Sequence, residues 1–534
     1  MNRKTLVLPA VIGLIAPVLA ACGGSNSGSS GGDAIVVGTT DSFTATKDAP
    51  APLDPAYAYD VGTWNILRQT VQTLMVQPKG EGDPVPEAAE SCGFTDAGNE
   101  RYACKLRSDL KFSNGNAVTA ADVKYSIDRA RAIKSDSGVF ALLSTIDTVE
   151  TQGDDQVIFH LKTADATFPF KLSTPVAGIV NPDDYQKDRL RDGFEVDGSG
   201  PYTLKADVQG DKMVKAVFTK NPNYKGSLKV NNDKAEMVSY DDSTALGAAL
   251  DKGDVDLVSR GLTPAQIKKY TNTAGGNVDV VELPGLEIRY LGFNTDASSV
   301  KDKAVREAMA QLINRSEIVS KVYGSQAESL YSLVPASVTG HSNAFFNKYG
   351  DPSVSKAASL LSKAGITTPV NLTLNYTTDH YGAVTKQEFE VIQKQLNNSG
   401  LFKIEIKGTP WESYVPAERK GKYDVYGMGW FPDFPDADNF LAPFVDKDNF
   451  LKSPYSNSQI INELIPQSRR QADRLTAASS LNEIQDIVAR DVPVLPLWQG
   501  KQYVVARDDV TGTAYALNSS STLQLWELGR GASS

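Results

Sequence analysis

The strongest constraint on the fold of this chain is a change of hydrophobic spacing between residues 370 and 408. Apolar and polar residues alternate through 370–376, which is typical of a strand with one buried face. Residues 384–396 carry apolar side chains at helical spacing, Gly400 is suited to ending that helix, and 401–407 predict a second strand. A strand, a helix and a strand in so short a stretch predict a βαβ unit, with parallel strands and a right-handed crossover.

Helix and strand signals are mixed throughout the rest of the chain. We expect strands at 34–40 and 156–161, and helices at 63–75, at 119–131 and from 302 to about 322. The chain has 534 residues, which is enough for about three domains. Its 41% hydrophobic and 22% charged residues are typical of a folded globular protein. These observations predict the α/β class.

The N-terminus resembles the export signal of a bacterial lipoprotein. Two basic residues, Arg3 and Lys4, precede an apolar run over 6–20 that is too short for a comfortable membrane span. The small residues of 19–21 then lead to Cys22, as in a lipobox. An ordinary secretory peptide with a chance cysteine is the alternative interpretation.

This resemblance implies that a signal peptide, residues 1–21, is removed and that Cys22 carries the lipid. One acyl chain binds a membrane only marginally, so such anchors use two or more. The Gly- and Ser-rich segment 23–32 cannot build a core and is expected to be a flexible tether. The predicted location is the cell membrane, with the body on its extracytoplasmic side.

Two further cysteines, Cys92 and Cys104, flank a segment rich in turn-forming residues. A disulfide here would join the two strands of a hairpin, as expected in an oxidising compartment. Two free thiols in a reducing cytoplasm are the alternative, and the export signal argues against them.

Composition and motifs argue against several classes of function. The net charge of −10 gives no positive field for a nucleic acid. The three histidines, at 160, 341 and 380, have no metal-ligand spacing, and no HExxH, GxSxG, phosphate-loop or CxxC motif is present. We therefore predict a protein that is not an enzyme and has no metal or other cofactor, although a triad built from distant residues stays open.

A set of short segments, taken in order, resembles the bacterial extracellular solute-binding proteins of the dipeptide- and oligopeptide-binding family, family 5, which capture solutes for ABC importers. These segments are 53–55, 86–91, 106–107, 112–115, 118–123, 198–202, 221–224, 291–295, 305–308 and 429–436. They span nearly the whole chain after Cys22. Most consist of turn glycines, prolines and buried strand residues, so we assign them to the scaffold.

The resemblance implies a two-lobed periplasmic-binding-protein-like fold with an extra domain and a hinge between the lobes. Closure about such a hinge lets one ligand contact both lobes. Hinges are expected near Leu283 and Leu495. The expected parts are a base lobe (33–75, 185–283 and 495–534), an extra domain (76–184) and a second lobe (284–494).

The family's ligand residues can be transferred to this sequence one by one. An acidic residue three positions after a Gly-Trp pair accepts the ligand's ammonium in peptide binders, and here it is Asp433, after Trp430. Phe431 and Val61 resemble positions whose main chain pairs with an extended ligand. Phe140 corresponds to an aromatic residue from the extra domain. The alternative for Asp433 is the organisation of a turn between two prolines.

Two more positions bear on the ligand. Trp411 resembles a tryptophan that walls a pocket, although core packing is an alternative for it and for the other aromatic candidates. Gly427 occupies a place where some oligopeptide binders carry an arginine for the ligand's carboxylate. The resemblance therefore does not imply a fixed peptide length.

The resulting hypothesis is a lipid-anchored receptor, expected to be monomeric, that captures short peptides and delivers them to ABC permease subunits. The same role with a non-peptide ligand is the first alternative: an oligosaccharide, an opine-like compound, a metal chelate or haem. A secreted hydrolase or an envelope assembly factor is the alternative from another class.

Overall fold

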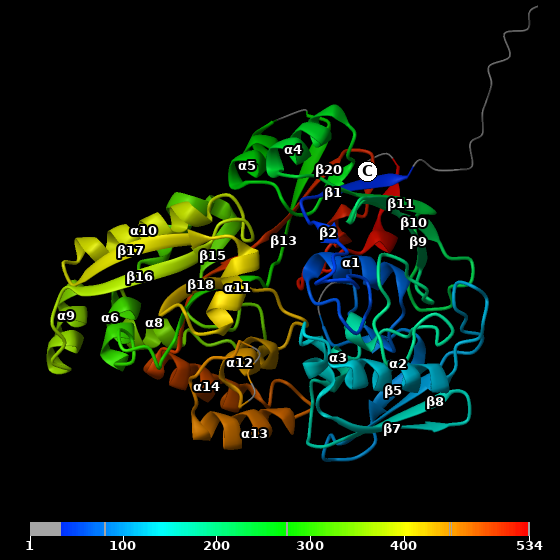
Figure 1. Cartoon of the computed structure of the whole chain (residues 1–534), viewed down its shortest axis with the longest axis horizontal. Helices are drawn as coiled ribbons and strands as arrows, with labels where there is room; N and C mark the ends of the chain where they lie inside the picture. Colours follow the sequence, from blue (N-terminus) through cyan, green and yellow to red (C-terminus); the bar gives the residue numbers. More distant parts are fainter. Residues whose placement is uncertain (1–33, 80–81, 274–275, 448, 450, 532–534) are drawn as a thin grey trace, which may run out of the picture.

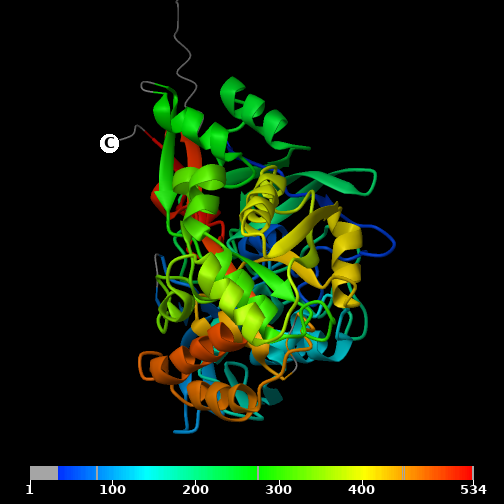
Figure 2. The same cartoon turned by 90° about the vertical axis from the view of Figure 1, so that its left-hand side faces the viewer.

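The computed structural model describes residues 34–79, 82–273, 276–447, 449 and 451–531. Two large bodies lie side by side, and elements from distant parts of the sequence build each of them (Figure 1). Figure 2 shows the body that contains 284–500 in front of the other. We call the body with the N-terminal strand the base lobe and the other body the second lobe. The signal peptide, Cys22 and the tether expected at 1–32 lie outside the described residues.

The base lobe contains an eight-stranded sheet in the order β13-β20-β12-β1-β11-β10-β2, with β9 paired to β10. Strand β1 pairs in parallel with both β11 and β12. The strands are β1 (Ile35–Thr39), β2 (Phe43–Thr44), β9 (Tyr202–Gln209), β10 (Lys212–Lys220), β11 (Lys234–Ser239), β12 (Leu257–Val258), β13 (Val278–Leu283) and β20 (Gln502–Arg507). Among the described residues, the α-helices of this lobe are α1 (Val61–Thr70), α4 (Ser243–Lys252) and α5 (Pro264–Asn272).

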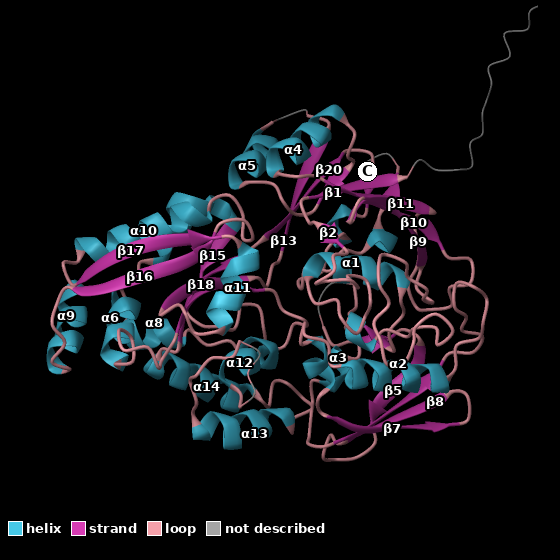
Figure 3. Cartoon of the chain, viewed as in Figure 1, coloured by secondary structure: helices cyan, strands magenta, loops and turns pink. Residues whose placement is uncertain are grey.

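The second lobe is built on a six-stranded sheet in the order β15-β19-β14-β18-β16-β17. Its strands are β14 (Ile288–Phe293), β15 (Ala327–Ser329), β16 (Val370–Thr377), β17 (Phe402–Thr409), β18 (Val425–Trp430) and β19 (Val494–Gly500). Helices cover the sheet (Figure 3). They are α6 (Lys303–Leu312), α7 (Arg315–Ile318), α8 (Ala344–Tyr349), α9 (Val354–Lys363), α10 (Thr385–Asn398), α11 (Trp411–Arg419), α12 (Ala437–Val445), α13 (Ile465–Arg469) and α14 (Ala478–Asp491).

The βαβ prediction is confirmed. Strands β16 and β17 run in parallel in a continuous register from the pair Val370 and Phe402 to the pair Thr377 and Thr409. Helix α10 connects them, and its buried residues include Phe389, Ile392 and Leu396. The apolar spacing of this segment was sufficient for the prediction because all three elements are neighbours in sequence.

Residues 76–184 form a smaller part beside the base sheet. A four-stranded sheet, β5-β6-β8-β7, carries helix α2. The elements are β5 (Ala89–Phe94), β6 (Arg101–Leu106), β7 (Ile146–Gln152), β8 (Gln156–Leu161), α2 (Ala120–Ile133) and α3 (Phe168–Lys171), and a short ladder pairs β3 (Met75–Val76) with β4 (Val85–Pro86). Cys92 lies opposite Cys104 in the β5–β6 hairpin, and the two form the predicted disulfide.

Helix α1 differs from the helix expected at 63–75. It begins at Val61 because the side chain of Asp60 accepts a hydrogen bond from the N–H of Thr63 at 2.9 Å, which caps the first turn. It ends at Thr70, and Val71 is already extended. The β-branched residues that follow favour this exit, since they lose rotamer freedom in a helix.

The chain crosses between the lobes twice, and the two crossings are paired. β13 runs antiparallel to β20 up to the pair Leu283 and Gln502, and β14 runs antiparallel to β19 from the pair Ile288 and Gln499. A Cβ atom at Gly285 would collide with the carbonyl of Gly500, so the crossings touch through their backbones. The hinge therefore consists of two adjacent segments.

The second crossing differs from the sequence-based expectation of a hinge near Leu495. Leu495 is fully buried and pairs with Leu291 in the middle of the six-stranded sheet. The chain leaves the second lobe only after Gly500, where β19 ends. Pairing with β14, more than 200 residues earlier, sets this boundary. The sequence around Leu495 alone therefore does not predict it.

Within the described residues, no helix combines the length and apolar character needed to cross a membrane. The same residues contain no group of three or more His, Cys, Asp or Glu side chains arranged to hold a metal ion.

A buried ion pair joins the base lobe to residues 76–184. Asp54 accepts two hydrogen bonds from the guanidinium of Arg129 in α2, at 2.8 and 2.6 Å, and both side chains are almost completely buried. The carboxylate also accepts from the N–H groups of Ala56 and Arg191. The fold therefore fixes the positions of three groups that bind the Asp54 carboxylate: the guanidinium of Arg129 and two main-chain N–H groups.

Replacement of Arg129 by leucine should destabilise the protein by about 3 to 5 kcal/mol, because the buried Asp54 carboxylate would lose its counter-charge. Urea unfolding followed by circular dichroism measures the change. Lys124→Leu, on the exposed side of the same helix, is the matched control and should cost less than about 1 kcal/mol. Equal effects of the two substitutions would contradict a structural role for the pair.

Candidate functional site

The carboxyl ends of parallel strands from both sheets face the region between the lobes, where open α/β sheets bind ligands. In the second lobe, Phe431 and Asp433 follow β18, and Trp411 follows β17. In the base lobe, Arg260 follows β12. We call the region around two contacts between the lobes, that of Asp433 with Tyr59 and that of Phe431 with Arg260, the inter-lobe site.

Asp433 is buried at this site, with 6% of the residue exposed. Its Oδ2 accepts a hydrogen bond from Nδ2 of Asn439 at 2.8 Å, and Oδ1 of Asn439 accepts from the N–H of Asp433 at 2.8 Å. Its Oδ2 also accepts from the hydroxyl of Tyr59, across the lobes, at 3.3 Å. The carboxylate therefore has one partner from each lobe.

Burial dominates the electrostatics of Asp433 and raises the pKa of its carboxyl to about 6. The hydrogen bonds from Asn439 and Tyr59 and the positive charges of Arg68 and Lys171 act in the opposite direction. A buried carboxylate held by neutral donors gains by adding a cation. The site is thus suited to a ligand ammonium group.

The turn that follows Asp433 is held by other acids. Asp436 accepts from the N–H of Asp438 as the N-cap of α12 and forms a two-bond ion pair with Arg474. Asp438 forms a similar pair with Arg469. The two hydrogen bonds between Asp433 and Asn439 close the same turn, so they are the contacts that support the turn alternative for Asp433.

The ring of Phe431 is half-buried and lies between two cations. The guanidinium carbon of Arg260 is 5.5 Å from the ring centroid, and that of Arg289, in β14, is 5.6 Å from it. Each distance is within the range of a cation–π interaction. Phe431 therefore contacts the base lobe as well as its own lobe.

The two candidate tryptophans lie in different environments. Trp430 is 7% exposed, and its ring packs edge-on against Phe444 in the core of the second lobe. Its side chain therefore belongs to the core of the second lobe, and its role as a ligand residue stays a prediction. Trp411 is half-buried and stacks on His380, with the ring centroids 3.7 Å apart.

Val61 and Phe140 were expected to contact the ligand from the base lobe and the extra domain. Val61 is the first residue of α1, where main-chain N–H groups have no acceptor within the helix, so it can donate to a ligand but is not part of a strand. Phe140 lies half-buried in the 3-10 helix Val139–Leu143. No described hydrogen bond or ring contact links Phe140 to the other candidates.

Gly427, where some relatives carry an arginine, has no room for a side chain. It lies in β18, and a Cβ atom there would overlap the ring of Phe389 from α10. The packing of this lobe therefore excludes an arginine at position 427.

Comparison with known proteins fits this geometry. The family model for bacterial extracellular solute-binding proteins, family 5 Middle, matches residues 83–452. The chain belongs to the bacterial extracellular solute-binding proteins, family 5. Members of this family bind solutes for transport.

The family 5 chain is similar over most of its length to curated peptide-binding proteins. It is 23% identical to the dipeptide-binding protein DppE of Bacillus subtilis, with 88% of each chain covered. It is 25% identical to di/tripeptide-binding protein 3 of Pseudomonas aeruginosa, over 86% of this chain and 89% of that one.

Solved structures establish the fold. The periplasmic binding protein DppA of Helicobacter pylori, in complex with the peptide STSA, has a TM-score of 0.79 at 22% identity, over 94% of this chain and 98% of that one. AgaA of A. tumefaciens R10, in complex with agropinic acid, has a TM-score of 0.78 at 22% identity, over 93% and 99%. The protein thus has the two-lobed fold of periplasmic binding proteins.

Sequence reasoning missed several residues of the family 5 inter-lobe site. Tyr59 and Asn439 hold Asp433, and Arg260 and Arg289 contact Phe431. The arginine within the apolar run 288–293 was the one available signal, because a buried strand seldom contains a charged side chain.

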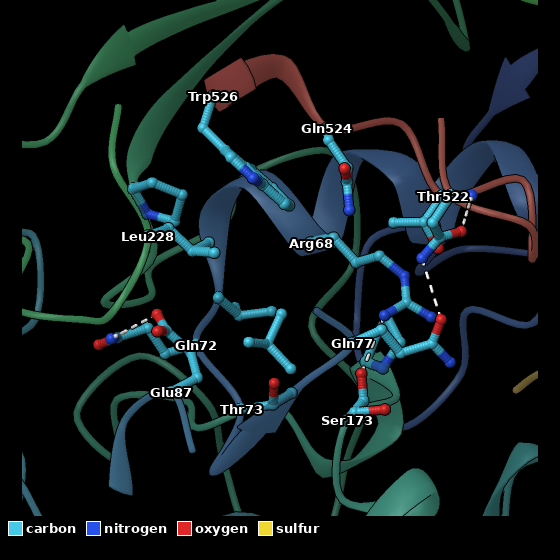
Figure 4. A pocket seen from close by; sticks show the side chains of 15 residues that line it. Arg68, Gln72, Thr73, Gln77, Glu87, Ser173, Leu228, Thr522, Gln524 and Trp526 are labelled. Atoms are coloured by element: carbon cyan, nitrogen blue, oxygen red, sulfur yellow. Dashed lines mark hydrogen bonds between the residues drawn. The ribbon is translucent and has the colours of Figure 1, made fainter. Parts of the chain in front are cut away.

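A pocket in the base lobe is lined by Arg68 of α1 together with residues of the C-terminal segment such as Gln524 and Trp526 (Figure 4). Arg68 donates to the carbonyl of Ser173 at 2.9 Å, and Asn518 donates to Oε1 of Gln77 at 3.0 Å. Nε2 of Gln77 is buried and has no partner among the described residues. An amide-rich lining of this kind suits ordered water.

In the ligand-free protein, the carboxyl of Asp433 should titrate near pH 6, as measured by carbon-13 NMR of side-chain carboxyls and assigned with Asp433→Asn. Asn439→Ala should raise this pKa further, because the charged form loses a donor. Asn347→Ala, at an exposed position of α8, is the control and should leave the titration unchanged.

The raised pKa of Asp433 also determines how the stability of the folded protein changes with pH. The folded state binds the proton of Asp433 more tightly than the unfolded chain, so stability falls as the pH rises from about 4 to 6. Asp433→Asn should remove that part of the pH dependence. Titration of Asp433 near pH 4 would contradict the effect of burial.

Proposed function

We propose that this protein is the extracytoplasmic substrate-binding lipoprotein of an ABC transporter, which captures short peptides and delivers them to the permease. The observation that carries the proposal is the buried carboxylate of Asp433, which lies between the lobes with a hydrogen-bond donor from each. An ammonium group would give it a counter-charge and link the lobes through the ligand.

The curated relatives support a peptide as the ligand. DppE, OppA and di/tripeptide-binding protein 3 are all named for peptides. A free amine is the feature that all unmodified peptides share, and main-chain pairing at Phe431 would add affinity without reading side chains.

An opine-like acid is the second candidate ligand. AgaA, whose structure is similar, was solved in complex with agropinic acid. Position 427 is a glycine in this chain, whereas some peptide binders carry there an arginine for the carboxylate of the peptide. Oligosaccharides, metal chelates and haem would leave Asp433 without a counter-charge unless they carried an amine.

Capture requires movement of the lobes and no bond chemistry. The paired segments 284–287 and 500–501 are the hinge, and the ligand stabilises the closed arrangement, which the permease recognises. We propose no enzymatic activity, no cofactor, no nucleic acid partner and a monomeric state.

The proposed location is the outer face of the cell membrane. Cys22 would carry the lipid, and 23–32 would hold the body near the permease. The proposed domains are those expected from the sequence, with the end of the second lobe moved from 494 to 500.

Asp433→Asn should weaken the binding of free-amine peptides by about tenfold or more, as expected for one charge-assisted contact. Titration calorimetry with trialanine measures the loss. Asp508→Asn, at an exposed position after β20, is the matched control and should not change the affinity.

N-acetylated trialanine provides the reciprocal test. It should bind the wild-type protein as weakly as trialanine binds the Asp433→Asn variant. Unchanged affinity of that variant, or equal binding of the acetylated peptide, would assign Asp433 to the turn.

Cys22→Ser should move the protein from the membrane fraction to the soluble extracytoplasmic fraction, because the thiol that carries the lipid is lost. Fractionation and immunoblotting measure this. Cys92→Ser, which removes the disulfide with Cys104, is the control and should leave the protein in the membrane fraction. Persistence of the Cys22→Ser variant in the membrane would refute the anchor.

A further inference from the structure

The lobes also meet at the end of their boundary that lies opposite the hinge. In Figure 1, β13 and β20 lie toward the top of this boundary, and α3 and α13 lie toward the bottom. There the N–H of Ala166 donates to the carbonyl of Arg469 at 2.8 Å. Nδ2 of Asn99 donates to the carbonyl of Arg470 at 3.0 Å. We call this contact the latch, and it consists of residues 99, 165–171, 434 and 469–470.

An aromatic pair is part of the latch. The rings of Phe170, in α3, and Phe434, which directly follows Asp433, are stacked with their centroids 5.6 Å apart. Phe170 is 5% exposed and Phe434 is 1% exposed. Separation of the lobes at this point would expose apolar surface of both rings to water, which is unfavourable in proportion to the area exposed.

The half of the latch that belongs to the extra domain is held by a buried carboxylate. Asp165 is completely buried, and its Oδ2 accepts from Nζ of Lys171 at 2.6 Å and from the hydroxyl of Thr145 at 2.8 Å. Its Oδ1 accepts from the hydroxyl of Thr167 at 2.6 Å. The N–H of Asp165 donates to the carbonyl of Asn99 at 3.1 Å, which connects the two parts of this half.

The half that belongs to the second lobe is held by ion pairs. Arg469 donates two hydrogen bonds to Asp438, at 2.8 and 3.0 Å, and its Nη1 lies 3.2 Å from Oδ2 of Asp446. These contacts fasten the end of α13 to α12. Because each half is ordered within its own lobe, little conformational entropy is lost when the two halves meet.

Charges attract one another across the latch. Burial raises the pKa of Asp165, but the positive charges of Lys171 and of Arg469, from the other lobe, hold it at about 2. The pKa of Asp438 is also lowered, against the effect of burial, by Arg469 and by Lys171. Each cation therefore interacts with a carboxylate of its own lobe and with one of the other lobe. Complementarity of this kind favours one way of meeting.

The latch restrains the lobes because the extra domain is fastened to the base lobe by the buried pair of Asp54 and Arg129. Rotation about the hinge displaces an atom in proportion to its distance from the axis. Opening therefore moves the two halves of the latch further apart than it moves groups beside the hinge. Hydrogen bonds act only over short distances, so a small rotation breaks those of the latch.

We propose that the extra domain stabilises the closed arrangement of the lobes through the latch, independently of the ligand. All groups of the latch belong to the chain itself, so their contribution is the same for every ligand. It raises the fraction of closed molecules, and the apparent affinity for any ligand held by both lobes scales with that fraction. The proposal goes beyond the proposed function, since it concerns closure and not the substrate.

Distances between two spin labels test the latch without a ligand. The labels are attached at Thr148→Cys, an exposed position of β7, and at Ser479→Cys, an exposed position of α14. Cys22→Ser removes the remaining thiol, since Cys92 and Cys104 form a disulfide. Bound molecules are removed by unfolding and refolding, and double electron–electron resonance then measures the ratio of closed to open molecules. The wild-type latch should give a measurable closed population.

Asn99→Gly weakens the latch by one hydrogen bond. Asn99 has a φ of 56°, so glycine keeps the backbone conformation and removes the side chain. The ratio of closed to open molecules should fall by about two- to tenfold, as expected for the loss of one hydrogen bond. Asn114→Gly is the matched control, because the side chain of Asn114 accepts from the N–H of Asn116 within an exposed turn of the same domain. It should leave the ratio unchanged.

Phe170→Leu is a second variant, which keeps an apolar side chain and loses the ring stacking. It should also lower the ratio, and circular dichroism checks that the protein stays folded. Titration calorimetry then compares trialanine with Ala-Phe-Ala. Each latch variant should weaken both peptides by the same factor, because the latch contributes to closure and not to recognition.

The absence of a closed population in the ligand-free wild type would overturn the proposal, as would an unchanged ratio in both latch variants. Weakening of one peptide without the other would also overturn it, since the residues would then contact the ligand. If neither peptide binds, the peptide function fails, and the spin-label distances alone decide whether the latch closes the lobes.

Discussion

The pairing of the two interlobe crossings is the constraint on which the rest of the structure depends. β13 and β20 belong to the base sheet, and β14 and β19 continue the same two chain segments into the second sheet. Close contact at Gly285 and Gly500 keeps the segments adjacent. The two sheets are therefore joined side by side at the hinge, and residues that follow strands of each sheet, such as Arg260 and Phe431, meet between the lobes.

Negative and positive side chains of the inter-lobe site lie in different surroundings. Asp433 is a carboxylate with neutral donors, whereas Arg260 and Arg289 are cations beside an aromatic ring. Burial strengthens the electrostatic interactions of these charged groups, since little water remains to screen them. In the function proposed above, a ligand that neutralises such a group would stabilise the closed arrangement more than the open one, and this difference would be the basis of capture.

Local sequence was sufficient for some features and insufficient for others. The unit 370–408, the strand 156–161 and the Cys92–Cys104 hairpin were predicted because their partners are close in sequence. β19 continues past the boundary expected near Leu495 and ends at Gly500, because its pairing with β14, a distant strand, holds it in the sheet.

The residues of the inter-lobe site also differ in how far local sequence could predict their positions. Asp433 was found through a resemblance, and its carboxylate lies between the lobes, where its role as a ligand residue stays a prediction. Trp430 belongs to the core because the register with Ile288 directs its ring inward. Arg260 and Tyr59 could not be placed beside Phe431 and Asp433, since only the folded hinge brings them together.

Mass spectrometry of small molecules released by denaturing the protein, freshly purified from its own cells, tests the central claim most directly. The account predicts a set of short peptides of varied sequence, each with a free amine. A single glycan, metal chelate or haem would contradict peptide capture and the role given to Asp433.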